Sequence, residues 1–175
     1  KKLDQCEGSQ QLIVVCGKNE KIREKLLEIK VSDSLDLKIL GFVHNMDEWM
    51  GAVDVIVTKA GPGTIAEATI QGLPIMLSSF LPGQEEGNIP YVVEGGYGSY
   101  SKDPEEIATT VKSWLLDDEK LSKMSANAKK AARPNATTAI ARDIAELLYA
   151  PYEPPTEVEI NRFEERKEEN NDIIT

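Results

Sequence analysis

Short, uninterrupted apolar runs alternate along this chain with longer segments in which apolar residues recur every three or four positions. Such runs are typical of strands buried on both faces of a parallel sheet, and the longer period is typical of helices. The apolar runs predict strands at residues 11–17, 35–43, 54–58, 73–79 and 97–101. The periodic segments predict helices at 18–30, 45–53, 88–95, 103–118, 119–133 and 136–150, and another directly after the glycines at 61 and 63.

Local features of the sequence predict the burial or the ends of several of these elements. The run QLIVVCG is apolar to its end, so we expect a fully buried strand with Cys16 as a small buried side chain. Asp103 followed by Pro104 predicts a helix start, with the aspartate as cap and the proline in the first helical position. Asn45 is the expected N-cap of a short helix.

The alternation of strands and helices predicts an α/β fold with a doubly wound parallel sheet, covered by helices on both faces. We assign this Rossmann-like domain to residues 1–150. The segment APYEPPTEVE then breaks the pattern with three prolines, and residues 151–175 carry eight acidic and three basic side chains. This acidic C-terminal tail is either a solvated extension or an arm that docks on a partner.

Composition narrows the classes of function. The 175 residues carry a formal net charge of −10, which argues against nucleic acid and against attraction to anionic lipid. Two cysteines and one histidine provide neither a disulfide framework nor a multi-histidine metal site. No apolar stretch approaches the roughly 20 residues that span a bilayer. The chain opens without methionine, so we expect a piece of a longer protein.

A glycine-rich turn, KAGPGT, joins a predicted strand to a predicted helix. Gly61 and Gly63 allow a ligand to approach the backbone, and Pro62 stiffens the turn. The amides of Gly63, Thr64 and Ile65 would then point out of a helix N-terminus, where a diphosphate is stabilised. The alternative is a plain connection between a strand and a helix.

Glu67 follows this turn and has two readings. With Thr64 it fits the pattern S/T-x-x-E, which is typical of a capping box at a helix start. Alternatively, its carboxylate accepts two hydrogen bonds from the 2′- and 3′-hydroxyls of a ribose beside the phosphate site.

A second polar loop, PGQEEGN, follows the next predicted strand. Since the carboxyl ends of parallel strands meet at one edge of a sheet, this loop should lie beside the glycine turn. Gln84, Glu85 and Asn88 offer the donors and acceptors that the hydroxyls of a hexose need. The alternative is an ordinary polar surface loop.

Together, these stretches resemble a known family. From about residue 12 to 148 the sequence is similar to the donor-binding half of the monogalactosyldiacylglycerol synthases of plants and algae, in glycosyltransferase family 28. The most specific piece is TKAGPGTIAEA…GLPI…PGQEEGNIPYVV. The resemblance implies the C-terminal domain of a GT-B fold, and transfer of galactose from UDP-galactose to 1,2-diacylglycerol with inversion.

The resemblance also implies roles for individual residues. The backbone of Phe42 and Val43 would hold uracil, and Glu67 would bind the ribose. Gln84 and Glu85 would contact the sugar, and Asn88 would support their loop. The remaining donor-binding residues would surround the diphosphate: Gly17, Lys18, Gly61, Pro62, Gly63 and Thr64.

The family's N-terminal acceptor domain has no counterpart in these 175 residues. The resemblance therefore implies no catalytic residue in this chain, and we do not carry the role of base to His44. Diacylglycerol and the membrane would be contacted by that other domain, at the chloroplast envelope. On its own, the chain is expected to bind UDP and to catalyse little.

No D-x-D pair occurs in the sequence, so we predict no metal and no cofactor for the departure of UDP, with main-chain amides stabilising the leaving group. Two other functions remain open at this stage. One is the donor subunit of a two-chain UDP-N-acetylglucosamine transferase of the endoplasmic reticulum, and the other is a catalytically silent nucleotide-binding module.

Overall fold

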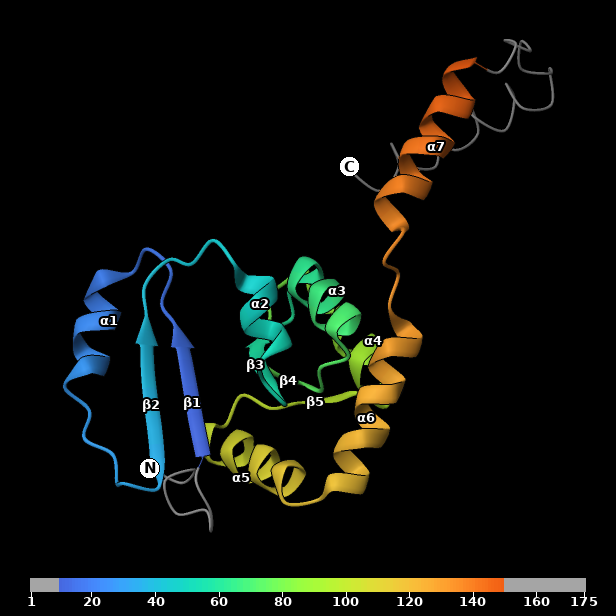
Figure 1. Ribbon diagram of the computed structural model, residues 1–175. Helices are drawn as coiled ribbons and strands as arrows, with labels where there is room; N and C mark the ends of the chain where they lie inside the picture. Colours follow the sequence, from blue (N-terminus) through green and yellow to red (C-terminus); the bar gives the residue numbers. More distant parts are fainter. Residues whose placement is uncertain (1–9, 150–175) are drawn as a thin grey trace, which may run out of the picture. The chain divides into compact units, whose positions relative to one another are not determined.

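The computed structural model describes residues 10–149 and shows an α/β protein (Figure 1). The predicted acidic tail lies outside the described residues, as does Cys6. The chain divides into two units between Pro134 and Asn135. The strands of the first unit are β1 (Gln10–Val15), β2 (Leu35–Leu40), β3 (Ile56–Lys59), β4 (Ile75–Ser79) and β5 (Gly98–Tyr100). Its helices are α1 (Glu20–Leu27), α2 (Met46–Gly51), α3 (Pro62–Gln71), α4 (Asn88–Glu94), α5 (Pro104–Leu115) and α6 (Asp118–Ala131).

All strand pairs among the described residues are parallel, as predicted. β1 pairs with β2, and β4 lies between β3 and β5 in a second sheet. The register places Ile75 of β4 opposite Ile56 on one side and Gly98 on the other. The class of fold is therefore confirmed, while hydrogen bonding groups the strands into two sheets.

The core is built around β4, the central strand of the larger sheet. Ile75, Met76 and Leu77 have no exposed surface, and successive side chains of a strand point to opposite faces. Ile75 and Leu77 pack in one cluster with side chains of α3 and α4, and Met76 packs in another with side chains of α5 and α6. Helices thus cover both faces of this sheet, which fixes the carboxyl ends of β3 and β4.

The prediction that the first strand is fully buried is wrong. Every residue of β1 is half-buried or exposed, and Cys16, which follows the strand, is half-buried. The cause lies in the pairing, because β1 has one hydrogen-bonded neighbour where β4 has two. α1, the helix between β1 and β2, also buries none of its side chains.

The starts of two helices can be compared with the predicted caps. Asp103 accepts a hydrogen bond of 3.0 Å from the amide of Glu105, and Pro104 begins α5, so this cap is confirmed. Asn45 does precede α2, but its side chain makes no capping bond and donates instead to the carboxylate of Glu48 at 2.8 Å. The side chain of Asn45 therefore contacts a carboxylate within α2 and not a backbone amide of its first turn.

The second unit is described through α7 (Ala136–Tyr149), which confirms the last predicted helix. The helix is amphipathic, and its apolar residues Ile140, Ile144, Leu147 and Leu148 are exposed. Within residues 10–149, no helix has the length and apolar character needed to cross a membrane.

Candidate functional site

The glycine turn connects the end of β3 to the start of α3 within two residues. Gly61 is the N-cap of α3, and its own amide donates to the carbonyl of Lys59 at 2.8 Å. The amide of Ile65 donates to the carbonyl of Gly61 at 3.0 Å, so it is already used inside the helix. The amides of Gly63 and Thr64 remain available to a ligand, because the amides in the first turn of a helix have no helical carbonyl to bind.

The two glycines of the turn lie in different surroundings. A Cβ atom on Gly61 would fall 2.8 Å from the Nζ atom of Lys59, so that position is filled by a neighbouring side chain. A Cβ atom on Gly63 would meet nothing within 4 Å. The space that a ligand could use therefore lies beside Gly63, at the first turn of α3.

Glu67 does not form the capping box with Thr64, so that reading is wrong. The helix begins at Pro62, which places Thr64 inside the first turn and Glu67 on the second, and the N-cap makes no side-chain hydrogen bond. Among residues 10–149 the exposed Glu67 has no hydrogen-bond or ion-pair partner. Its carboxylate is free to accept bonds from a ligand.

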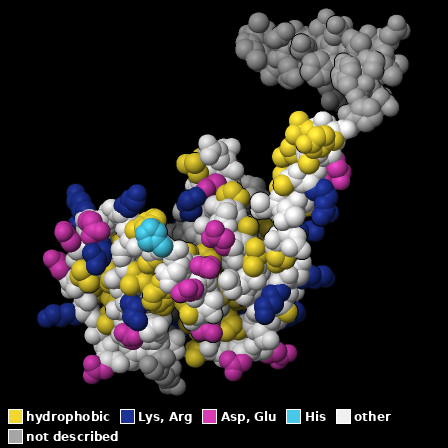
Figure 2. Space-filling model, turned by 45° about the horizontal axis from the view of Figure 1, so that its top comes forward, with side chains coloured by type: hydrophobic (Ala, Val, Ile, Leu, Met, Phe, Trp, Pro, Cys, Tyr) yellow, Lys and Arg dark blue, Asp and Glu magenta, His cyan; other side chains and the backbone are white. Residues whose placement is uncertain are grey.

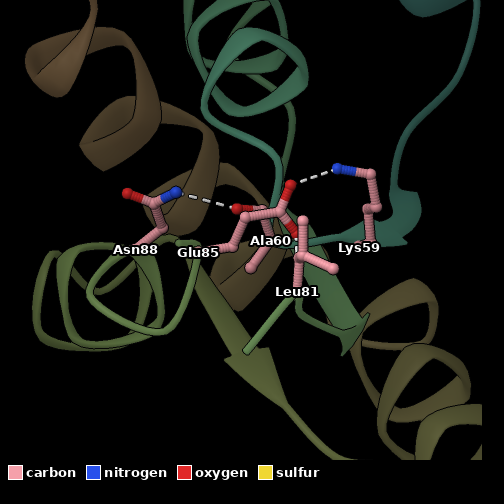
Figure 3. A network of polar contacts seen from close by, with 5 residues as sticks. All are labelled: Lys59, Ala60, Leu81, Glu85 and Asn88. Atoms are coloured by element: carbon pink, nitrogen blue, oxygen red, sulfur yellow. Dashed lines mark hydrogen bonds and ion pairs between the residues drawn. The ribbon is translucent and has the colours of Figure 1, made fainter. Parts of the chain in front are cut away.

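The loop after β4 is joined to the turn by two polar contacts (Figure 3). Nζ of Lys59 forms an ion pair and hydrogen bond with Oε1 of Glu85. Nδ2 of Asn88 donates to the carbonyl of Ala60 at 2.8 Å. Both contacts link residues of the PGQEEGN loop to the end of β3, so the two loops have a fixed mutual position.

Glu85 is held on both carboxylate oxygens. Besides the contact with Lys59, its Oε2 accepts the amide of Leu81 at 2.9 Å. The hydrogen bond from Lys59, followed by that from Leu81, lowers the pKa of Glu85 below its ordinary value of 4.5. Glu85 is buried, whereas Gln84 beside it is exposed, so Gln84 is the member of the pair that a sugar can reach.

This lowered pKa predicts a pH-dependent contribution to stability. The folded protein favours the charged form of Glu85, so the contribution is complete above pH 4.5 and is lost as the pH falls through the lowered pKa. Glu85→Gln should therefore reduce the drop in melting temperature between pH 7 and pH 3. Thermal denaturation at both pH values tests this, and an equal drop in the variant would contradict it.

The other predicted donor-binding residues gather at the carboxyl ends of β1 and β2. Gly17 has φ of 56°, a conformation that suits glycine. Nζ of Lys18 lies 5.6 Å from the ring centroid of Phe42, and the ring of His44 meets Phe42 edge-on at 5.0 Å. Val43 is half-buried between these exposed neighbours. The histidine side chain stands on the surface beside apolar side chains (Figure 2).

The predicted residues thus form two groups, one around Gly63 and Glu67 and one around Phe42. Lys59 was not among the predictions, although the structure places it at the glycine turn. Its position directly before the turn, at the end of an apolar run, was the available indication in the sequence. Within residues 10–149, no cluster of three or more His, Cys, Asp or Glu could hold a metal ion.

Comparison with known proteins identifies the family independently of the structure. Residues 1–147 match the model of the glycosyltransferase family 28 C-terminal domain. The chain is 50% identical over 143 residues to the chloroplastic monogalactosyldiacylglycerol synthase of Spinacia oleracea, covering 81% of this chain and 27% of that protein. It is 48% identical over 138 residues to monogalactosyldiacylglycerol synthase 3 of Arabidopsis thaliana, with coverage of 78% and 29%. The chain therefore spans less than a third of the length of these relatives.

Among solved structures, MurG of Acinetobacter baumannii superposes with a TM-score of 0.71. That likeness covers 83% of this chain and 44% of MurG, at 21% sequence identity. At this identity the likeness concerns the fold, and it agrees with the parallel α/β arrangement described above.

Proposed function

Because this chain belongs to glycosyltransferase family 28 through its C-terminal domain, we propose that it is the donor-binding domain of a galactolipid synthase. The reaction is transfer of galactose from UDP-galactose to 1,2-diacylglycerol, with inversion, giving monogalactosyldiacylglycerol and UDP. Identity near 50% to plant monogalactosyldiacylglycerol synthases supports this assignment. The same relatives do not favour the N-acetylglucosaminyltransferase alternative.

One structural observation carries the proposal, namely the open first turn of α3. The first turn of this helix has open space at Gly63 and two unused amides, those of Gly63 and Thr64. The next turn carries the unpartnered carboxylate of Glu67. The helix dipole adds roughly half a positive charge at this end. A nucleoside diphosphate matches this arrangement, with its phosphates at the amides and its ribose diol at Glu67.

The remaining donor-site residues take roles that fit their surroundings. Phe42 and Val43 hold uracil through their backbone, and Gln84 contacts galactose. Gly17 and Lys18 lie near the phosphates. Asn88 supports the loop through its bond to Ala60, and Gly61 and Pro62 shape the turn.

Departure of UDP places negative charge on the β-phosphate, and helix-end amides stabilise charge that develops there. Since the sequence has no D-x-D pair, we assign this task to amides and basic side chains, without a metal. The catalytic base, the diacylglycerol site and the membrane contact belong to the part of the relatives that this chain does not cover. These relatives are named chloroplastic, which supports a place in the chloroplast, and within it we assign the protein to the envelope.

Calorimetric titration of the chain with UDP-galactose and UDP-N-acetylglucosamine tests the assignment. We expect saturable binding of both through the shared UDP, with tighter binding of UDP-galactose because Gln84 and its loop face the hexose. If the chain binds neither nucleotide, the proposed donor site is refuted. Tighter binding of UDP-N-acetylglucosamine would move the function to the other transferase class.

A further inference from the structure

Lys59 and Glu85 form an asymmetric ion pair. The side chain of Lys59 is 59% exposed, whereas that of Glu85 is 9% exposed. Exposed ion pairs contribute little to stability, and burial of an ion pair costs a desolvation energy that can exceed the attraction between its charges. Here the carboxylate is enclosed and the ammonium faces outward, so the pair presents a positive charge at the surface.

The anchoring of Glu85 explains how that charge is held in place. Its two oxygens are engaged by Lys59 and by the amide of Leu81, within a loop that Asn88 ties to Ala60 (Figure 3). The carboxylate is almost fully enclosed, so contact with a sugar would require Glu85 to leave its buried position. Its geometry suits a residue that fixes another side chain.

The ammonium of Lys59 is held at the glycine turn. Its Nζ atom occupies the space beside Gly61 where a side chain would otherwise begin, 2.8 Å from an ideal Cβ position. This places a full positive charge at the N-terminus of α3, next to the turn that bears the free amides of Gly63 and Thr64. An ammonium has three protons, so Lys59 can bind Glu85 and still donate to an anion.

We propose that Lys59 is a diphosphate-binding residue of the donor site and that Glu85 is a positioning residue that holds its ammonium beside Gly61. The inference rests on the proposed function, and it reassigns Glu85 from sugar contact to support of Lys59. It also separates Lys59 from Lys18, whose ammonium lies over the ring of Phe42. Lys59 neutralises the phosphates without taking part in recognition of the base or the hexose.

Calorimetric titration of the full chain with UDP and with uridine tests the proposal. Lys59→Met should weaken UDP binding by about tenfold or more, as expected for loss of a hydrogen bond between charged groups, and leave uridine binding unchanged. Lys59→Arg should restore much of the UDP affinity. Lys123→Met is the matched control, since it removes the same charge from an exposed position of α6 and should have no effect.

Lys59→Met leaves the buried carboxylate of Glu85 without its cation and can impair folding. The double variant Lys59→Met/Glu85→Gln removes both charges and keeps an acceptor for the amide of Leu81. It should fold and show the same selective loss of UDP affinity. Glu85→Gln alone should weaken UDP binding less than Lys59→Met, because the ammonium stays but loses its charged anchor.

The outcomes separate this inference from the proposed function. If the unaltered chain binds UDP and the folded variants without Lys59 bind it equally well, the inference is overturned and the proposed function stands. Equal losses for UDP and uridine would also overturn it, because they would show a general structural role. If the unaltered chain binds no UDP, both proposals fail.

Discussion

Gly63→Val should abolish measurable UDP binding while leaving the fold intact. A Cβ atom at this position meets nothing within 4 Å in the protein itself, so we expect the variant to fold. Replacing a helical glycine should keep or raise the free energy of unfolding, by at most about 1 kcal/mol. The same side chain would stand between a diphosphate and the amides of Gly63 and Thr64.

The expected loss of affinity follows from those two amides. Each hydrogen bond to a charged group contributes about 1.5 kcal/mol or more, so losing both reduces affinity at least about a hundredfold. Calorimetry with UDP and thermal denaturation measure the two effects separately. Ala126→Val, at an exposed position of α6, is the matched control: it should leave UDP affinity unchanged and lower the free energy of unfolding by about 0.5 kcal/mol, because valine has the lower helix propensity. Retained UDP affinity in the folded Gly63→Val protein would show that the phosphates bind elsewhere.

Glu67→Ala should lower UDP affinity about a hundredfold, because it removes an acceptor for two ribose hydroxyls. Glu67→Gln keeps the shape and loses the charge, so its loss should be smaller, about tenfold. Neither change should alter the melting temperature, since the side chain of Glu67 caps nothing and has no partner among residues 10–149.

The 2′-deoxy form of UDP makes this test specific for the ribose. The unaltered chain should bind it more weakly than UDP, and Glu67→Ala should bind the two nucleotides alike. Glu94→Ala, which removes an exposed carboxylate from α4, should keep the discrimination. If Glu67→Ala still prefers UDP by the original factor, the carboxylate does not touch the ribose.

Most elements and one cap, which depend on neighbouring residues, were predictable from the sequence. Asp103 and Pro104 define the start of α5 because the capping bond spans two residues. The parallel α/β class followed from apolar runs alternating with helical segments. The burial of β1 was mispredicted because it depends on the number of neighbouring strands, which the composition of QLIVVCG does not reveal.

In the candidate site one prediction failed on local information, and one contact depended on residues that are distant in the sequence. The capping box failed because Pro62 begins the helix, with its ring already holding the helical φ angle, so Thr64 falls inside the first turn. The pairing of Lys59 with Glu85 joins residues 26 positions apart, and it depends on β3 and β4 lying side by side. No short-range pattern in the sequence encodes that contact.

The two links between the loop after β4 and the glycine turn have an evolutionary consequence. Glu85 and Asn88 are committed to partners in the protein, so a substitution at either disturbs the turn as well as the loop. The side chain of Gln84 is exposed and is not committed in this way. Under the proposed function, adaptation to a new hexose can therefore proceed at this one position while Glu85, Asn88 and the glycine turn stay unaltered.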